Sequence, residues 1–472
     1  MNLVYGVKDR PKFGQLIVFA FQQLLAILAA TIAVPSIVGN GMSQSAALFG
    51  AGVGTIVYLL FTKFRSPVFL GSSFAFLGSM FAAFGGAVSV SVGYAGLIIG
   101  ACFAGLVYVV IALIVKFAGV KWINRLMPAV VIGPTVAIIG LSLAGNAIGD
   151  LMKGSVLKEV TEKVLVIAED GTASIADQVS RVPVASPWIA LLCGLVTMFV
   201  VILCSVYGKK MAKLIPFVIG IAAGYAVAAI FTVIGNTTGN EALQIIDFSL
   251  FKNMKWVPEF AFLEAFKGFG EGGVTWGYIA TVAVAYIPVA FVVFAEHIAD
   301  HKNLSSIIGS DLLEDPGLHR TLLGDGVGSI AGAFFGGCPN TTYGESVGCV
   351  AITKNASVVT ILCTAVLAIA VSFFGPFVTA LATIPSCVMG GVCITLYGFI
   401  AVSGLKMLQP VDLNDNRNLF TASVILIAGV GGMALTIAGK ITLTEVATAL
   451  ILGIIVNLVV NLGRKKREEE KA

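Results

Sequence analysis

The sequence predicts an all-α polytopic membrane protein with 14 transmembrane segments, arranged as two inverted repeats of seven spans. The composition, the apolar segments and two motifs that recur in both halves lead to this fold. Of the 472 residues, 58% are hydrophobic and only 11% are charged, whereas an ordinary soluble domain has roughly 25% charged residues. The composition excludes a water-soluble enzyme. The net charge of +4 gives no indication of nucleic-acid binding.

Long apolar runs provide most of the expected spans, since crossing a bilayer takes about 20 apolar residues. Three weaker segments, Phe69–Phe84, Leu322–Gly337 and Glu345–Thr353, are short and rich in Gly and Ser, and counting them gives 14 spans. The clear runs cover residues 14–38, 44–62, 91–115, 127–148, 187–206, 214–235, 276–295, 357–383, 386–404, 418–438 and 442–462.

Basic residues near both ends of the chain support an even number of spans. Lys8, Arg10 and Lys12 precede the first run, and a basic tail from Arg464 to Arg467 follows the last one. Positive residues favour the cytoplasmic side of a membrane. We therefore expect both termini in the cytoplasm.

Two motifs recur in corresponding spans of the two halves. Met127–Pro134 and Ile384–Gly391 share the same spacing from Pro to Gly, and Ser72–Ala75 resembles Thr341–Gly344 in having two hydroxyl residues, an aromatic residue and a small residue. Because seven spans is an odd number, the second copy would be inverted in the membrane. Inverted repeats with interrupted spans indicate a transporter site near the midplane. Chance similarity between small-residue membrane segments is the alternative explanation.

The interrupted segments Gly71–Phe76 and Gly336–Glu345 are poor helix formers. Non-helical backbone at membrane depth occurs only inside the protein or along a cavity, where its free N–H groups are donors. A half-helix that begins near Tyr343 would also direct the positive end of its dipole into the gap. Phe74 and Tyr343 could enclose a planar ring. These features predict a site for a small polar molecule.

Carboxylates inside the membrane are the second indication of a site. Glu296 ends an apolar run, Glu345 lies in the second break, and Asp325 lies in a Gly-rich segment. Asp300 follows Glu296 by four residues and shares its helix face, whereas His297 should face elsewhere. Ionisable residues inside a membrane are functional candidates by default.

Each of these residues also has a structural interpretation. Thr342-x-x-Glu345 fits a helix capping box, and Glu296 and Asp300 could be solvated charges at the interface. His297 fits a packed or capping histidine, and Asp325 fits a residue that stabilises a neighbouring helix. No metal-binding cluster, nucleotide-binding loop or CxxC pair is found in the sequence, so we expect no cofactor or metal.

The motifs together resemble the nucleobase–ascorbate transporter family, and specifically its bacterial uracil permease and uracil–xanthine permease branch. The resemblance covers almost the whole chain, and its specific parts are Leu70–Phe76, Ala295–His297 and Gly336–Lys354. The family signature begins here at Glu345 and ends at Lys354, with Ser346 where Asn is usual. Glu at the first position is typical of uracil carriers, and Gln there is typical of xanthine and urate carriers.

The resemblance implies the domain organisation. A core domain would comprise residues 1–120 (spans 1–4) and 272–383 (spans 8–11). A gate domain would comprise residues 121–271 (spans 5–7) and 384–472 (spans 12–14, with the cytoplasmic basic tail). Short antiparallel strands would occupy the breaks in spans 3 and 10. Family members are often dimers, which implies a homodimer in the plasma (inner) membrane.

The resemblance also implies the roles of individual residues. Glu296 would accept the N–H groups of a nucleobase, and Glu345 would make a second side-chain contact. The main-chain amides of Phe74 and Gly344 would donate to the carbonyl groups of the base, and Ala30 and Tyr343 would line the pocket. Supporting roles fall to the residues around this set: Ser346, Thr342, Ser73 and His297.

A proton-coupled uracil symporter is the function that the resemblance implies, with the core moving against the gate. Desolvation favours the neutral, protonated form of a buried carboxylate, so Glu296 and Asp300 together are the hypothesis for the coupling proton. A xanthine or other purine carrier is the close alternative. An anion transporter of the same fold, a channel and a membrane enzyme are more distant alternatives.

Overall fold

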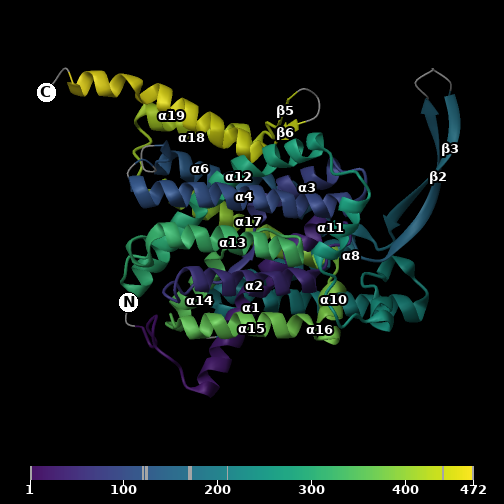
Figure 1. Cartoon of the computed structure of the whole chain (residues 1–472). Helices are drawn as coiled ribbons and strands as arrows, with labels where there is room; N and C mark the ends of the chain where they lie inside the picture. The colour runs from purple at the N-terminus through teal and green to yellow at the C-terminus, as the bar shows by residue number, and fades with distance from the viewer. Residues whose placement is uncertain are drawn as a thin grey trace. The chain divides into compact units, whose positions relative to one another are not determined.

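The computed structural model describes residues 3–119, 122, 126–167, 173–209, 211–437 and 441–469. As the sequence predicts, most of them are helical (Figure 1). Their contacts divide the chain into two units. Unit 1 comprises Met1–Ala144, Lys255–Val378 and Leu396–Ala472, and unit 2 comprises Gly145–Met254 and Thr379–Thr395.

Unit 1 contains most of the helices. Several begin at a hydroxyl residue that caps the first turn: the side chains of Ser43, Ser89 and Thr275 accept hydrogen bonds from Ala46 N, Val92 N and Tyr278 N, each at 3.2 Å, which satisfies an amide that has no partner within the helix. The helices are α1 (Phe13–Val38), α2 (Gln44–Phe61), α3 (Leu77–Gly85), α4 (Val90–Ala118), α6 (Ala129–Ser142), α11 (Ala261–Gly270), α12 (Trp276–Ile308), α13 (Leu318–Gly336), α14 (Gly344–Thr353), α15 (Val358–Ser372), α18 (Asn416–Val430) and α19 (Glu445–Glu469).

Short strands and turns complete this unit. The strands β1 (Leu70–Ser72) and β4 (Asn340–Thr342) pair with each other, and β5 (Leu435–Ile437) pairs with β6 (Ile441–Leu443). The strands that the resemblance implies in the two interrupted segments are therefore present. The turn η1 (Phe74–Phe76) is a 3-10 helix and follows β1. The π-helical turn η4 (Leu313–Gly317) precedes α13.

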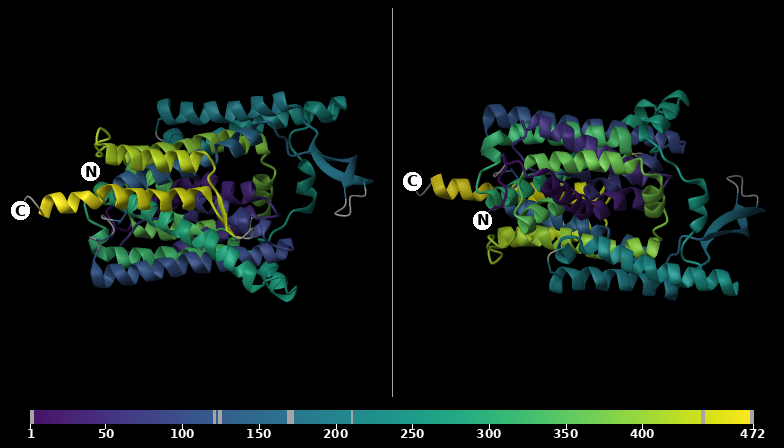
Figure 2. Two further views of the ribbon diagram at one scale, coloured as in Figure 1. Left: turned by 90° about the horizontal axis from the view of Figure 1, so that it is seen from above. Right: turned by 90° about the horizontal axis from the view of Figure 1, so that it is seen from below.

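Unit 2 contains two long apolar helices and a hairpin. Most side chains of α8 (Pro187–Tyr207) and α10 (Pro216–Thr238) face outward, since only 28% of the most apolar 18-residue stretch of each helix is buried. The hairpin of β2 (Leu157–Ile167) and β3 (Ala173–Pro183) projects away from the helices of this unit (Figure 2). The remaining elements are α9 (Met211–Leu214), η2 (Glu241–Leu243) and η3 (Phe248–Asn253).

Three further helices are divided between the two units or lie at their boundaries. They are α7 (Ala144–Leu151), α16 (Gly375–Ala382) and α17 (Ser386–Lys406). The helices α6 and α17 begin directly after Pro128 and Pro385, the prolines of the first recurring motif. Proline fits the start of a helix because it has no N–H group to donate to a preceding turn and because its ring would clash with that turn.

Nine helices in the described part of the chain are long and apolar enough to cross a membrane, or ten if α15 and α16 are one broken span. The count of 14 spans is not reached on this criterion. The segments that fall short are α3, α14 and α18, which are too short, and α13, which contains His319, Arg320 and Asp325 and is therefore not apolar enough. The protein is thus a multi-span membrane protein with at least nine apolar spans among its described residues.

The structure corrects three of the expected spans. The run 357–383 is broken between α15 and α16, which are bent by 83° relative to each other. The run 418–438 is helical only to Val430, because the β5–β6 hairpin begins at Leu435. The run 276–295 is part of a helix that continues to Ile308, since charged and hydroxyl residues are tolerated where a helix leaves the apolar region.

Some expectations fall at the edges of the described residues. The predicted boundary between residues 120 and 121 lies outside them, as do residues 470–472 at the end of the basic tail.

The beginning of α1 and the end of α19, both in unit 1, lie at the same end of its helices (Figure 1).

Candidate functional site

The two interrupted segments meet as a pair of antiparallel strands in unit 1. Leu70, Gly71 and Ser72 lie opposite Thr342, Thr341 and Asn340, respectively. Backbone hydrogen bonds extend the pairing beyond the strands, from Ser73 N to Pro339 O (2.9 Å) and from Tyr343 N to Phe69 O (3.3 Å). Each break is thereby satisfied by the other, which removes the cost of unpaired backbone groups in an apolar surrounding.

A close contact between Gly71 and Tyr343 explains the glycine in the first break. A Cβ atom at Gly71 would lie 2.3 Å from the Tyr343 ring, so a larger residue cannot replace it without moving the ring. The Tyr343 hydroxyl donates to Ser72 O at 2.9 Å. Tyr343 therefore fastens the beginning of α14 to the first break.

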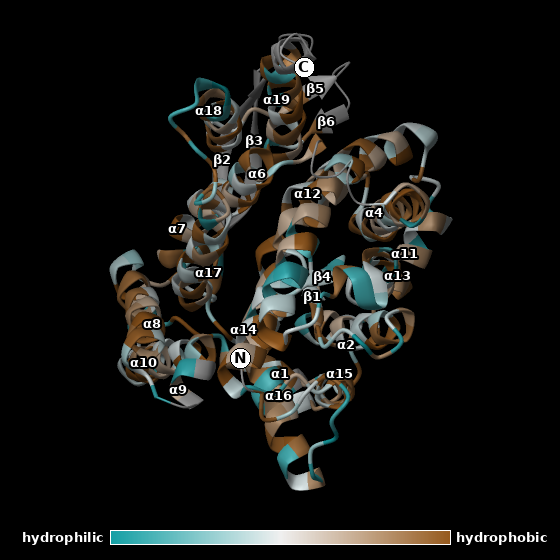
Figure 3. Cartoon of the chain, turned by 90° about the vertical axis from the view of Figure 1, so that its left-hand side faces the viewer, coloured by the Kyte–Doolittle hydropathy of each residue, from teal (hydrophilic) through white to brown (hydrophobic). Residues whose placement is uncertain are grey.

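Two residues outside the predicted set hold the strand pair against α2 and α13. Thr55 of α2 accepts from Leu70 N at 2.9 Å and donates to Leu70 O at 3.2 Å. Asn340 Nδ2 donates to Gly50 O at 3.1 Å, and a Cβ atom at Gly332 would lie 2.3 Å from the Asn340 side chain. Gly332 thus lies where α13 packs closely against Asn340 of β4 and against Gly50 of α2. Figure 3 shows β1 and β4 among α2, α12, α13 and α14. Both α2 and α13 contact β1, both α12 and α13 contact β4, and α14 contacts α12.

The predicted carboxylates lie beside this strand pair. Glu296, Asp300 and Glu345 are all partly exposed, and they interact electrostatically with one another. Asp300 Oδ2 accepts a hydrogen bond from Thr342 Oγ1 at 2.7 Å. By contrast, the Glu296 carboxylate accepts no side-chain hydrogen bond from the described residues. It is a free acceptor next to the junction of β4 and α14.

Glu345 lies in the first turn of α14, which begins at Gly344 and is preceded by Tyr343. No side chain caps this helix, and the Thr342 hydroxyl is occupied by Asp300. The capping-box interpretation of Thr342 and Glu345 is therefore wrong. At the positive end of the helix, Gly344 is exposed and Glu345 is partly exposed.

Ser346 is fully buried and connects three segments of unit 1. Its hydroxyl accepts hydrogen bonds from Gln23 Nε2 of α1 at 2.5 Å and from Phe69 N at 3.2 Å. Sequence reasoning did not select Gln23, although an amide inside an otherwise apolar helix is an unusual residue. Gln23 supplies an amide beside the position where the family signature usually has Asn.

His297 belongs to a separate buried network. It is hydrogen-bonded through Nδ1 to Asp325 Oδ2 at 2.7 Å and through Nε2 to Thr321 Oγ1 at 3.0 Å. His301 stacks on it with ring centroids 4.0 Å apart, and the hydroxyl of Tyr58 is 2.7 Å from His301 Nε2. His297 thus connects α12 to α13, as a packed histidine would. Among the described residues, no hydrogen bond joins its ring to Glu296, Asp300 or Glu345.

The remaining predicted residues lie around the strand pair. Phe74 is 8% exposed and makes an edge contact with Tyr397, with ring centroids 5.7 Å apart. Ala30 is buried in α1, which contacts β1 and α14. The Ser73 hydroxyl is buried without a hydrogen-bond partner among the described residues. No group of three or more His, Cys, Asp or Glu side chains with the geometry of a metal site occurs in the part of the chain that the structure describes.

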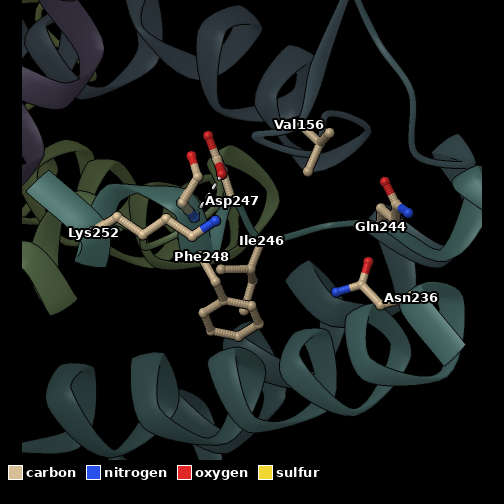
Figure 4. Close-up of a pocket in the computed structure, with 8 residues that line it drawn as sticks. Val156, Asn236, Gln244, Ile246, Asp247, Phe248 and Lys252 are labelled. Atoms are coloured by element: carbon tan, nitrogen blue, oxygen red, sulfur yellow. Dashed lines mark hydrogen bonds between the residues drawn. The ribbon is translucent and has the colours of Figure 1, made fainter.

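A cavity of about 280 Å³ lies outside the predicted site, in unit 2. Figure 4 shows the amides of Asn236 and Gln244 on one side and Asp247 and Lys252 on the other. Asp247 Oδ1 accepts from Ser249 N at 2.9 Å and so caps the turn η3. These polar groups stabilise the segment that follows α10.

Comparison with solved structures defines the class of protein. The transmembrane domain of the cyanobacterial bicarbonate transporter BicA is similar, with a TM-score of 0.57, 15% identity and coverage of 96% of this chain and 99% of that one. At this identity the likeness concerns the fold. The protein is a multi-span membrane protein with a transporter fold.

The chain belongs to the Permease family, whose model matches residues 14–170 and 163–438. It is 39% identical over 468 residues to the uracil permease of Bacillus caldolyticus, covering 99% of this chain and 96% of the relative. It is 36% identical over 469 residues to the uracil permease of Bacillus subtilis, covering 98% and 97%. The family that the motifs indicated is therefore confirmed. Membership points to a transporter rather than to an enzyme.

Proposed function

We propose that this protein is a secondary active transporter that imports uracil by proton symport. The observation that carries the proposal is the Glu296 carboxylate, which has free acceptor capacity beside two paired breaks in the membrane helices. Relatives that are named uracil permeases align with almost the whole chain. The site and the relatives therefore support the same class of substrate.

The chemistry of the site suits a neutral planar base. Uracil presents alternating N–H and C=O groups, so it needs acceptors and donors in one plane. Glu296 would accept from the N–H groups, and Glu345 would make a second side-chain contact. Phe74 and Gly344 are the first residues of η1 and α14, where main-chain N–H groups lack partners within the helix. They would donate to the C=O groups, while Ala30 and Tyr343 would form the walls.

Proton coupling is assigned to Glu296 and Asp300. They lie one turn apart on α12, and Asp300 is already held by the Thr342 hydroxyl. Protonation of one carboxyl group would relieve the repulsion among the acids of the site, and this would favour entry of a proton together with the substrate. Ser346, Thr342, Ser73 and His297 would support the site through the contacts described above.

The antiparallel pairing of the two recurring segments supports 14 spans in two inverted repeats. Inversion of the second repeat would give corresponding segments opposite directions in the membrane. The strands β1 and β4, which belong to the two recurring segments, do run antiparallel. Movement of a core (1–120, 272–383) against a gate (121–271, 384–472) would then expose the site alternately on the two sides of the membrane.

We also propose that the protein is a homodimer in the plasma membrane with both termini in the cytoplasm. The family and the basic ends of the chain favour this arrangement.

A xanthine or purine permease of the same family differs from the proposal only in its substrate. An anion transporter is disfavoured by the carboxylates at the site, since negative side chains oppose an anionic substrate.

Uptake of labelled uracil into proteoliposomes with an inward proton gradient tests the proposal. We expect accumulation above equilibrium that a protonophore abolishes and that unlabelled uracil, but not xanthine, competes. Competition mainly by xanthine would leave the site in place and change the substrate. Flux without accumulation would contradict symport and favour a channel.

The matched control is Glu241→Gln. This glutamate is exposed in unit 2 and pairs with Lys158. Its replacement changes the net charge by the same amount as the site variant Glu296→Gln. Uptake by this variant should equal that of the unmodified protein.

A further inference from the structure

A cavity of about 220 Å³ lies at the ends of three helices of unit 1, away from the strand pair. It is bordered by Phe61 at the end of α2, by the last turns of α4 and by the first turns of α13. Both α2 and α4 are long and apolar enough to cross a membrane. The cavity therefore lies where these spans leave the apolar part of the bilayer. Its lining residues are Phe61, Ala112, Leu113, Lys116, His319, Arg320 and Leu323.

The charges that line the cavity are all of one sign. Lys116 and Arg320 both interact electrostatically with the His319 ring, and no acidic residue is among the lining side chains. Neither cation forms an ion pair with the described residues. Asp315, which precedes α13, is occupied by Arg65 at 2.6 Å. Two uncompensated cations at one cavity favour an anionic ligand.

The beginning of α13 adds further donors to the cavity. This helix has 19 residues, and no side chain caps its N-terminus at Gly317. The positive end of its dipole and the side chains of His319 and Arg320 thus lie on the same side of the cavity. Backbone N–H groups at a helix N-terminus bind phosphate groups particularly well.

The other wall of the cavity is apolar and continues onto the membrane-facing surface. Leu113 is 47% exposed, and Phe117 beside it is 80% exposed, with Lys116 Nζ 5.7 Å from the centre of its ring. A soluble phosphate would leave this apolar surface uncovered. An acyl chain along α4 would cover it while the phosphate occupies the basic end.

We propose that this cavity binds the headgroup of an anionic phospholipid, with the phosphate held by Lys116 and Arg320 and an acyl chain lying against Leu113 and Phe61. Basic pockets between membrane helices at the membrane surface have the chemistry that such lipids require. The site is separate from the carboxylates of the strand pair. Its occupancy does not depend on which molecule the protein transports.

Native mass spectrometry of the full chain in detergent, titrated with phosphatidylglycerol or phosphatidylcholine, tests the proposal. We expect tighter binding of phosphatidylglycerol to the unmodified protein. Each surface cation contributes about 1 kcal/mol to anionic lipid binding. The double variant Lys116→Gln/Arg320→Gln should therefore bind phosphatidylglycerol about 30-fold more weakly, and Lys116→Gln alone about 5-fold more weakly. Lys116 is exposed, so the single variant should fold normally.

The matched control is Lys12→Gln/Lys406→Gln. Both lysines are exposed and neither lines the cavity, so this variant loses the same charge and should bind phosphatidylglycerol like the unmodified protein. Equal losses in both double variants would overturn the proposal, because the effect would then be one of net charge. Displacement of the lipid by millimolar inorganic phosphate would also overturn it, by assigning the cavity to soluble phosphate. Undiminished binding by Lys116→Gln/Arg320→Gln would do the same.

Discussion

The two interrupted segments of unit 1 are alike in geometry and different in chemistry. Each consists of three strand residues followed by the start of a helix, and the two strands pair with each other in antiparallel directions. The first break continues into Phe74 and an apolar turn, whereas the second continues into Gly344, Glu345 and Ser346. The shared pairing positions both breaks, and the unshared side chains give the second break its polar character.

A second contrast occurs between neighbouring residues of α12. Glu296 is partly exposed and its carboxylate is free, whereas His297 is fully buried and bonded at both ring nitrogens to Asp325 and Thr321. An ionisable residue inside the membrane is therefore not by itself a substrate ligand. The distinction depends on whether its hydrogen-bonding groups are already satisfied.

Removing the charge of Glu296 is expected to have the largest effect on transport. Glu296→Gln keeps the shape of the side chain but replaces one acceptor oxygen with a donor, which would oppose an N–H group of the substrate. Hydrogen bonds to charged groups contribute about 1.5–3 kcal/mol, so binding should weaken at least tenfold, and proton-driven accumulation should be lost. Equilibrium binding and uptake of labelled uracil measure the two effects separately.

The contrast would fail if His297→Asn impaired binding as much as Glu296→Gln did while leaving the thermal stability unchanged. His297 would then act on the substrate rather than on helix packing. We expect the opposite pattern, with a lower melting temperature and a smaller change in affinity.

Gly71→Ala tests the geometry that the two breaks share. The added Cβ would lie 2.3 Å from the Tyr343 ring, and overpacking of this kind costs about 1–3 kcal/mol. The variant should melt at a lower temperature and bind the substrate more weakly, because the ring holds the start of α14. Gly85→Ala on α3 is the control, since a Cβ atom there meets nothing within 4 Å. Equal behaviour of the two variants would show that the Gly71–Tyr343 contact is unimportant.

The breaks themselves could be predicted from the sequence, but their partners could not. Gly71–Phe76 and Gly336–Glu345 contain residues that are incompatible with a regular membrane helix, and this local property is visible in the chain. The register between Gly71 and Thr341 depends on residues far apart in the sequence. The same limitation explains why Thr55 and Asn340 were not selected, since their roles arise only when α2 and α13 are in contact.

The bend between α15 and α16 was missed for a different reason. Residues 357–383 contain no charged residue, so hydrophobicity alone does not distinguish one straight span from two short helices at 83°. The free and satisfied states of Glu296 and His297 could be anticipated only in part. Their separation by about 100° on a helix placed them on different faces, but it did not show that Asp325 would be the partner of His297.

Ser346 offers a more moderate test of the second break. Ser346→Ala removes the acceptor of both Gln23 Nε2 and Phe69 N, and leaving a buried amide unsatisfied costs about 1–3 kcal/mol. Substrate affinity should fall several-fold because the start of α14 loses its connection to α1. A double-mutant cycle with Gln23→Leu should give a coupling energy of about 0.5–3 kcal/mol. Strict additivity of the two substitutions would contradict a direct Gln23–Ser346 interaction.

Two adjacent threonines in β4 provide the most closely matched test. Thr342 donates to Asp300 at 2.7 Å, whereas the Thr341 hydroxyl is buried without a partner among the described residues. Thr342→Val should therefore cost about 1.5–3 kcal/mol of stability because it removes a hydrogen bond to a carboxylate. Thr341→Val should be neutral or slightly stabilising, because it removes an unsatisfied polar group. If Asp300 takes part in proton coupling, only Thr342→Val should alter the pH dependence of uptake. A change of the same size in both variants would mean that β4 responds to the loss of any hydroxyl, and that the second break owes its chemistry to Glu296 and Glu345 alone.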